Sequence, residues 1–206
     1  MLSKLVIFLL SLIPISQCQT SNIQSRNNLK NTLLANYRND NIPLENEPVN
    51  LTLGLAIRAL NNVDQIEGTI TMNIWLRYNW NDPRLAWNKS EWNNISSLAF
   101  NTHPETDGIW VPDIYIYNTG ETPMSELDYS RAVVNNKGDI LWSRPGLIKS
   151  TCLFDLNLFP YDTQNCHLKF GSWSYHGRDL CLLTATPDID TSNYKDNEEW
   201  RLIDYN

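Results

Sequence analysis

The chain has 206 residues, 42% of them apolar, and a formal net charge of −7 without long runs of like charge. An acidic chain without basic clusters is not expected to bind nucleic acid, and its charge favours either solubility or a cationic ligand. The three histidines, His103, His167 and His176, lack metal-ligand spacing and no nucleophile motif occurs, so we expect no enzyme activity, no metal and no other cofactor.

The N-terminus has the pattern of a secretory signal peptide. One lysine precedes an apolar run from Leu5 to Ile15, which is shorter than the ~20 residues of a membrane-spanning helix. Ser16 and Cys18 put small residues three and one positions before a cut that follows Cys18. We therefore expect residues 1–18 to be removed in the secretory pathway and residues 19–206 to form one extracellular domain.

Three N-glycosylation sequons agree with secretion, although each triplet alone can arise by chance. They begin at Asn50, Asn88 and Asn94. No apolar run after residue 15 approaches the length of a membrane span, so the chain as it stands is expected to be soluble or incomplete.

A short helix is expected first in the mature chain. Leu29, Leu33 and Tyr37 fall at helical spacing, with Ser25 as the predicted cap and an end near Asn39. From Leu51 to Ala59 apolar and other residues alternate, which predicts a strand with one face on a core. The polar residues 61–68 are then expected to form a turn.

The next predicted strand contains a tryptophan on its polar face. Between Thr69 and Trp80 apolar residues alternate with threonine, asparagine and arginine, and Trp75 falls among the polar ones. Leaving an indole ring in water forgoes several kcal/mol of apolar burial. We expect either that a neighbouring loop covers Trp75 or that the ring forms a subunit contact or a ligand wall.

Further short strands with turns between them predict an all-β sandwich. Val133 to Trp142 is typical of a hairpin around the turn Asn135–Gly138. The other expected strands are residues 114–118, 180–185 and 200–203, with an acidic loop over residues 187–199.

Cys152 and Cys166 are separated by thirteen residues and can close a covalent loop in a secreted protein. That loop is unusually apolar, and Pro160 prevents a regular strand through it. Either the bridge only stabilises the fold, by roughly 3 kcal/mol, or the loop is a docking surface for another domain or a membrane. Cys181 is then left over, either as a small buried hydrophobe or for an intermolecular bridge.

Four ordered blocks resemble the extracellular ligand-binding domain of the Cys-loop pentameric ligand-gated ion channels, nicotinic acetylcholine receptors in particular. They are Trp75–Trp87, Trp110–Asn118, the cysteine loop with Phe159, Pro160, Tyr161 and Asp162, and Phe170–Tyr175. The resemblance runs from about residue 25 to the end. It implies an immunoglobulin-like β-sandwich with a short N-terminal helix, in a homo- or heteropentamer of homologous subunits at the extracellular, synaptic face of the plasma membrane.

The resemblance also implies a site for a small cationic neurotransmitter such as acetylcholine between adjacent subunits. Aromatic ring faces attract a cation by roughly 0.5 to 2 kcal/mol each. Tyr117 and Trp173 match the principal face, and Trp75 with Arg77 beside it matches the complementary face. The rest of the complementary wall matches Val134, Leu141 and Ser143. The disulfide-closed loop Cys152–Cys166, with residues 159–162, would couple the ligand to a pore.

In that family the principal face also uses a hairpin with two aromatic rings, and this sequence ends before it. We therefore expect a fragment that lacks this hairpin and four transmembrane helices, and that reaches the membrane only through the missing part. Two alternatives are a secreted soluble binder similar to the acetylcholine-binding proteins, and a secreted β-sandwich lectin or enzyme. The long apolar loop favours the channel, because the soluble relatives generally have a shorter, more polar one.

Overall fold

The computed structural model describes residues 23–44, 46–103, 108–119, 129–186 and 188–203. A single helix, α1 (Ile23–Leu34), comes first among these. The strands are β1 (Val49–Asp64), β2 (Thr69–Asn81), β3 (Ser97–Phe100), β4 (Ile114–Ile116), β5 (Ala132–Asn135), β6 (Asp139–Thr151), β7 (Phe170–Ser172) and β8 (Leu180–Thr184). Two short 3-10 helices, Pro83–Leu85 and Lys89–Glu91, separate β2 from β3. No helix in this part of the chain is long and apolar enough to cross a membrane.

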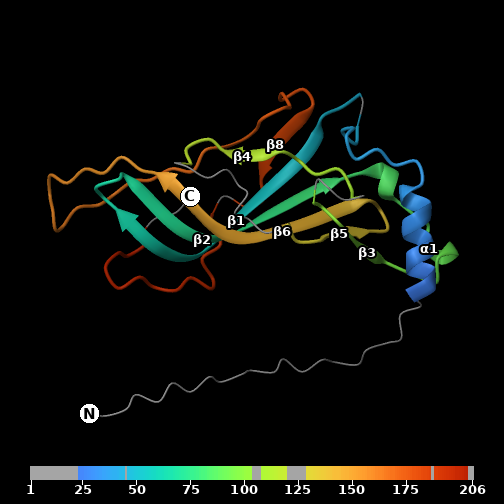
Figure 1. Ribbon diagram of the computed structural model, residues 1–206, viewed down its shortest axis with the longest axis horizontal. Helices are drawn as coiled ribbons and strands as arrows, with labels where there is room; N and C mark the ends of the chain where they lie inside the picture. The colour runs from blue at the N-terminus through green and yellow to red at the C-terminus, as the bar shows by residue number, and fades with distance from the viewer. Residues whose placement is uncertain (1–22, 45, 104–107, 120–128, 187, 204–206) are drawn as a thin grey trace, which may run out of the picture.

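Six strands form one sheet in the order β3-β5-β6-β2-β1-β8, and β4 pairs with β7 in a second, two-stranded sheet. Neighbours are antiparallel except for β1 and β8, which are parallel. In Figure 1 the long strands β1, β2 and β6 run side by side along the molecule, and α1 stands at one end of the sheet. The predicted all-β sandwich with a short N-terminal helix is confirmed.

Alternate residues of the long strands form the core. Tyr78 of β2 and Trp142 of β6 are 1% exposed, and their ring centroids lie 5.0 Å apart. The remaining core side chains of β2 are likewise at most 7% exposed: Ile70, Met72, Ile74, Leu76 and Trp80. The alternation predicted for this strand is therefore confirmed, and Trp75 lies on its opposite face.

Strand β1 differs from its prediction because it contains irregularities. It continues to Asp64, through residues that were expected to form a turn. Its register with β2 shifts between Ile57 and Ala59 and again between Leu60 and Asn62. An extra residue on one strand moves the following side chains to the other face, which an alternation pattern does not reveal.

Two other expectations are corrected. The helix already includes Ser25, so this residue is not its cap, and it ends at Leu34 rather than near Asn39. Residues 200–203 form no regular strand. Instead, the preceding segment lies along β1, with parallel bridges from Asp190 to Ala56 and from Lys195 to Ala59.

A buried polar cluster attaches the segment after α1 to the sheet. Asp82 is 0% exposed, and its carboxylate accepts hydrogen bonds from the Tyr37 hydroxyl at 2.6 Å and from Arg84 Nη2 at 2.8 Å. The Tyr37 hydroxyl also accepts the backbone N–H of Trp110 at 3.0 Å. Burial, and then the neighbouring Asp82 carboxylate, raise the pKa of Tyr37 above its usual range. The Tyr37 hydroxyl therefore remains a donor to Asp82 at physiological pH.

Candidate functional site

The outer face of the six-stranded sheet carries a strip of side chains that includes Trp75. Strand register puts Trp75 opposite Pro145 and Arg77 opposite Ser143. One further step along β2, the Cα partner of Asn79 is Leu141. Trp75 is 38% exposed, Leu141 is 46% exposed and Ser143 is half-buried. Four of the five residues predicted for the complementary face, Trp75, Arg77, Leu141 and Ser143, thus share one surface.

Val134 does not share that surface. It is fully buried in the core, whereas Val133 is 44% exposed and is the Cα partner of Leu141. The prediction that Val134 lines the wall is therefore wrong by one residue. Two adjacent valines are equally apolar, so their residue types do not indicate which of them points inward. Val133 takes the position in the strip.

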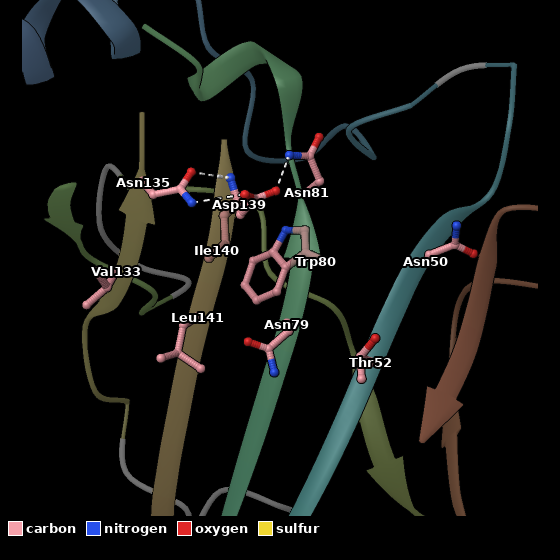
Figure 2. A pocket seen from close by; sticks show the side chains of 10 residues that line it. All are labelled: Asn50, Thr52, Asn79, Trp80, Asn81, Val133, Asn135, Asp139, Ile140 and Leu141. Carbon is pink, nitrogen blue, oxygen red and sulfur yellow. Dashed lines mark hydrogen bonds between the residues drawn. The ribbon is translucent and has the colours of Figure 1, made fainter. Parts of the chain in front are cut away.

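A surface hollow of about 490 Å³ lies at one end of the strip. In Figure 2, Thr52, Asn79, Leu141 and Val133 form a row across β1, β2, β6 and β5. The Asp139 carboxylate beside them accepts hydrogen bonds from the side-chain amides of Asn135 and Asn81. These bonds, that from Asn135 first, lower the pKa of Asp139. The lining contains amide and apolar groups, the Thr52 hydroxyl and the Asp139 carboxylate, and no basic side chain.

Two arginines lie close to Trp75 and differ in their partners. The Arg58 guanidinium stacks on the indole, with Cζ 4.3 Å from the ring centroid. Arg77 forms an ion pair with Asp190 at 2.9 Å. Hydrogen bonds from the Ser192 hydroxyl and backbone N–H, and then that from Arg77, lower the pKa of Asp190 to about 2. Arg58 was not predicted as a site residue, and its only signal in the sequence was its place on the polar face of the first predicted strand.

The two rings predicted for the principal face follow the two paired strands of the second sheet, one at each end of the pairing. Tyr117 follows β4 and is 55% exposed, and Trp173 follows β7 and is 74% exposed. The Tyr117 hydroxyl donates to the backbone carbonyl of Ser172 at 2.6 Å. A third ring, Tyr115, lies 5.9 Å from Trp173 between centroids. Tyr115 was not predicted as a site residue, although its alternation with Tyr117 put both tyrosines on one face of the strand.

Gly171 allows Tyr117 to take this position. A Cβ atom on Gly171 would lie 2.5 Å from Tyr117 Cε2 and 2.9 Å from its hydroxyl oxygen. The glycine is therefore required by the close approach of the tyrosine ring to the backbone of β7.

Asp113, which directly precedes β4, holds the segment that carries Trp173. Its carboxylate accepts hydrogen bonds from the Ser172 hydroxyl and from the backbone N–H of Ser174 at 2.7 Å. Its backbone carbonyl accepts the N–H of Trp173 at 3.3 Å. Bonds on both sides of Trp173 fix its backbone relative to β4, so that Tyr115 and Trp173 remain adjacent.

Cys152 and Cys166 form a disulfide, with Cα atoms 5.1 Å apart. Phe154 of the enclosed loop is half-buried against the core. Most of the loop's apolar side chains are exposed, among them Leu153, Leu158, Phe159 and Tyr161 at 67–96%. Pro160 is exposed as well, and Asp162 is half-buried.

The turn between β1 and β2 lies beside this loop. The Cys152 N–H donates to the Gly68 carbonyl at 2.8 Å, and Ile66 in the same turn is 99% exposed. This end of the molecule, opposite α1 in Figure 1, therefore presents a group of uncovered apolar side chains.

All three sequon asparagines are exposed. Asn50 lies on β1 beside the hollow, Asn88 caps the second 3-10 helix, and Asn94 follows it. Cys181 on β8 is half-buried and is a free thiol. Within the described ranges, no group of three or more histidine, cysteine or carboxylate side chains is arranged to hold a metal ion.

Comparison with known proteins gives consistent matches over this domain. A model of the neurotransmitter-gated ion-channel ligand binding domain matches residues 26–206. Neuronal acetylcholine receptor subunit alpha-6 of Rattus norvegicus is 37% identical over 182 residues, which cover 87% of this chain and 36% of that protein. Acetylcholine receptor subunit alpha-type acr-16 of Caenorhabditis elegans is 38% identical over 172 residues, 82% of this chain and 34% of that protein. Neuronal acetylcholine receptor subunit beta-3 of Gallus gallus is 31% identical over 183 residues, 88% and 39% respectively. The chain thus spans little more than a third of the length of these relatives.

Proposed function

Because the chain belongs to the family of neurotransmitter-gated ion-channel ligand-binding domains, we propose that it binds a cationic agonist at the contacts between subunits of a pentameric channel. Its relatives are receptor subunits rather than enzymes, so the enzyme alternative is set aside. A domain of this family is extracellular. The agonist proposed here is acetylcholine or a similar small quaternary or protonated amine, and the partners are homologous subunits.

The main observation in support of this proposal is the exposure of three aromatic rings. Trp75, Tyr117 and Trp173 are 38%, 55% and 74% exposed, although burial of such rings ordinarily stabilises a fold. Trp75 lies on the six-stranded sheet, whereas Tyr117 and Trp173 follow the strands of the other sheet. Two adjacent copies, one contributing each set, would enclose a cation between ring faces that each attract it by about 0.5 to 2 kcal/mol.

The proposed complementary wall is the strip on the outer sheet face. It consists of Trp75, Arg77, Ser143, Leu141 and, in place of Val134, Val133. Its apolar members would contact the uncharged part of a ligand, and the hollow beyond Leu141 leaves room for it.

Coupling to a pore would pass through Asn118, the neighbour of Tyr117. The Asn118 side-chain amide donates to the carbonyl of His167, next to Cys166, and its backbone carbonyl accepts the N–H of Thr151, next to Cys152. Its side-chain oxygen accepts the N–H of Lys169 at 2.9 Å. A displacement of Tyr117 by a ligand would therefore reach both ends of the disulfide loop. The exposed apolar side chains of the loop, with Phe159, Pro160, Tyr161 and Asp162 at its tip, would transmit it to the membrane-spanning part of a full-length subunit.

The proposed processing follows from the extracellular location. Residues 1–18, which lie outside the described residues, are proposed to be a cleaved signal peptide, and residues 19–206 the extracellular domain. Asn50, Asn88 and Asn94 are proposed to carry N-linked glycans, since all three side chains are exposed. Peptide N-glycosidase treatment of the secreted or surface protein should remove up to three glycans, and no change in mass would contradict this assignment.

The agonist site is tested in channels assembled from the full-length subunit, alone or with a homologous alpha subunit. Trp75→Ala and Trp173→Ala should each raise the half-maximal acetylcholine concentration about 10- to 100-fold, and the phenylalanine variants much less. Ile23→Ala, which removes an exposed apolar side chain from α1, is the control. Unchanged acetylcholine responses in both alanine variants would remove the proposed site.

A further inference from the structure

Arg58 occupies an irregular position in β1. The pairing of β1 with β2 passes from Ile57 directly to Ala59, so Arg58 has no Cα partner on β2. A bulge of this kind bends the strand and redirects the side chain of the extra residue. Here the guanidinium lies over the indole of Trp75, with Cζ 4.3 Å from the ring centroid.

The charge of Arg58 is not neutralised within the described part of the chain. The ion pairs found there do not include Arg58, and its buried Nη1 atom has no hydrogen-bond acceptor. Arg77, which lies near the same ring, has a neutralised charge because it forms an ion pair with Asp190 at 2.9 Å. Burial of an unpaired guanidinium N–H is unfavourable, so the indole ring is the interaction that holds Arg58 in place.

We propose that Arg58 is a specificity-determining residue that competes with the ammonium group of a ligand for Trp75 and so disfavours small quaternary cations. This inference rests on the proposed function, because it requires a cationic ligand at Trp75. Both cations are attracted by the same negative ring surface, and two like charges at one ring repel each other. A ligand therefore gains less from Trp75 than it would gain from an unoccupied ring.

Tetramethylammonium is the suitable probe, because it carries the charge and has no hydrogen-bond acceptor. Its apparent affinity is measured in channels assembled from the full-length subunit, corrected for the amount of receptor at the cell surface. Arg58→Gln keeps a long polar side chain, removes the charge and should raise the affinity about 3- to 30-fold. Arg58→Lys keeps the charge and should stay within about twofold of the parent channel.

The control is Arg38→Gln. Arg38 is exposed and paired with Asp40 in the segment that follows α1, so its replacement removes one positive charge that lies outside β1 and β2. It should leave the affinity for tetramethylammonium unchanged. If Arg58→Gln does not reach the cell surface, Arg58→Met is measured in the same way with the same expectation.

Trp75→Ala separates this inference from the proposed function. In that background Arg58→Gln should have no effect, because the ring for which the cations compete is gone. The inference is overturned if Trp75→Ala weakens binding while Arg58→Gln lowers the affinity or leaves it within twofold. It is also overturned if Arg58→Lys raises the affinity as much as Arg58→Gln. If Trp75→Ala leaves the affinity unchanged, the proposed function itself fails.

Discussion

Replacement of Gly171 by alanine tests the packing beneath the proposed principal face. The added Cβ would lie 2.5 Å from Tyr117 Cε2, and an ordinary contact needs at least 3.4 Å, so the ring has to move by about 0.9 Å. The Tyr117 hydroxyl is bonded to the Ser172 carbonyl at 2.6 Å, and such a displacement would break or distort this bond. The loss of packing and of the hydrogen bond should cost about 1–3 kcal/mol.

The effect of Gly171→Ala should appear in two assays on the full-length receptor. Thermal unfolding should shift to lower temperature, and the half-maximal acetylcholine concentration should rise up to about tenfold, since the displaced ring loses part of a cation attraction of about 0.5 to 2 kcal/mol and 1.4 kcal/mol is tenfold in affinity. Gly177→Ala is the matched control, because a Cβ at Gly177 meets nothing within 4 Å. In a Tyr117→Ala background, Gly171→Ala should have almost no further effect. Equal behaviour of the two glycine variants would refute this account of how Tyr117 is positioned.

Three other predictions concern stability, each measured by thermal or denaturant unfolding. Tyr37→Phe removes one hydrogen-bond partner from Asp82 and one from the Trp110 N–H, and should lower the free energy of unfolding by about 1–3 kcal/mol. The control Tyr161→Phe, in the exposed loop, should not change it measurably. Joint replacement of Cys152 and Cys166 by serine should lower the free energy of unfolding by roughly 3 kcal/mol, because the disulfide is lost. Cys181→Ser removes only a free thiol and should leave the contribution of the disulfide unchanged. The folded pKa of Asp190, about 2, lies below its ordinary value of 3.8, so its contribution is complete above about pH 4 and is lost as the pH falls toward 2. Asp190→Asn should remove the loss of stability between about pH 4 and about pH 2 that is due to Asp190, and Asp188→Asn should not. The same dependence of stability on pH in the parent protein and in both variants would contradict this prediction.

Regular alternation explains what was predictable about the fold. The inward side chains of β2, from Ile70 to Trp80, are all buried in the core, so the sequence pattern and the structure agree. The same regularity identified Trp75 as a ring on the outer face without reference to any family. The hairpin of β5 and β6 was predictable because its turn residues, Asn135 to Gly138, are typical of such connections.

The features of the fold and of the site that the sequence pattern did not predict depend on non-local contacts. The bulge at Arg58 has no sequence signature, yet it decides what covers Trp75. Val133 and Val134 are the same residue type, and only the register of the hairpin decides which of them faces the core. The segment at Asp190 aligns with β1 through backbone bridges and an ion pair to Arg77, which link residues more than a hundred positions apart. Such contacts follow from the tertiary arrangement rather than from local propensity.

The central claim is that aromatic rings from two adjacent subunits enclose one cation. The most direct measurement is a structure of the assembled full-length pentamer with a bound quaternary ammonium agonist. The account predicts that the ammonium group lies within about 6 Å of the ring of Trp173 in one subunit and of the ring of Trp75 in its neighbour. An agonist bound elsewhere, or a subunit boundary that leaves Trp75 and Trp173 apart and facing solvent, would contradict it.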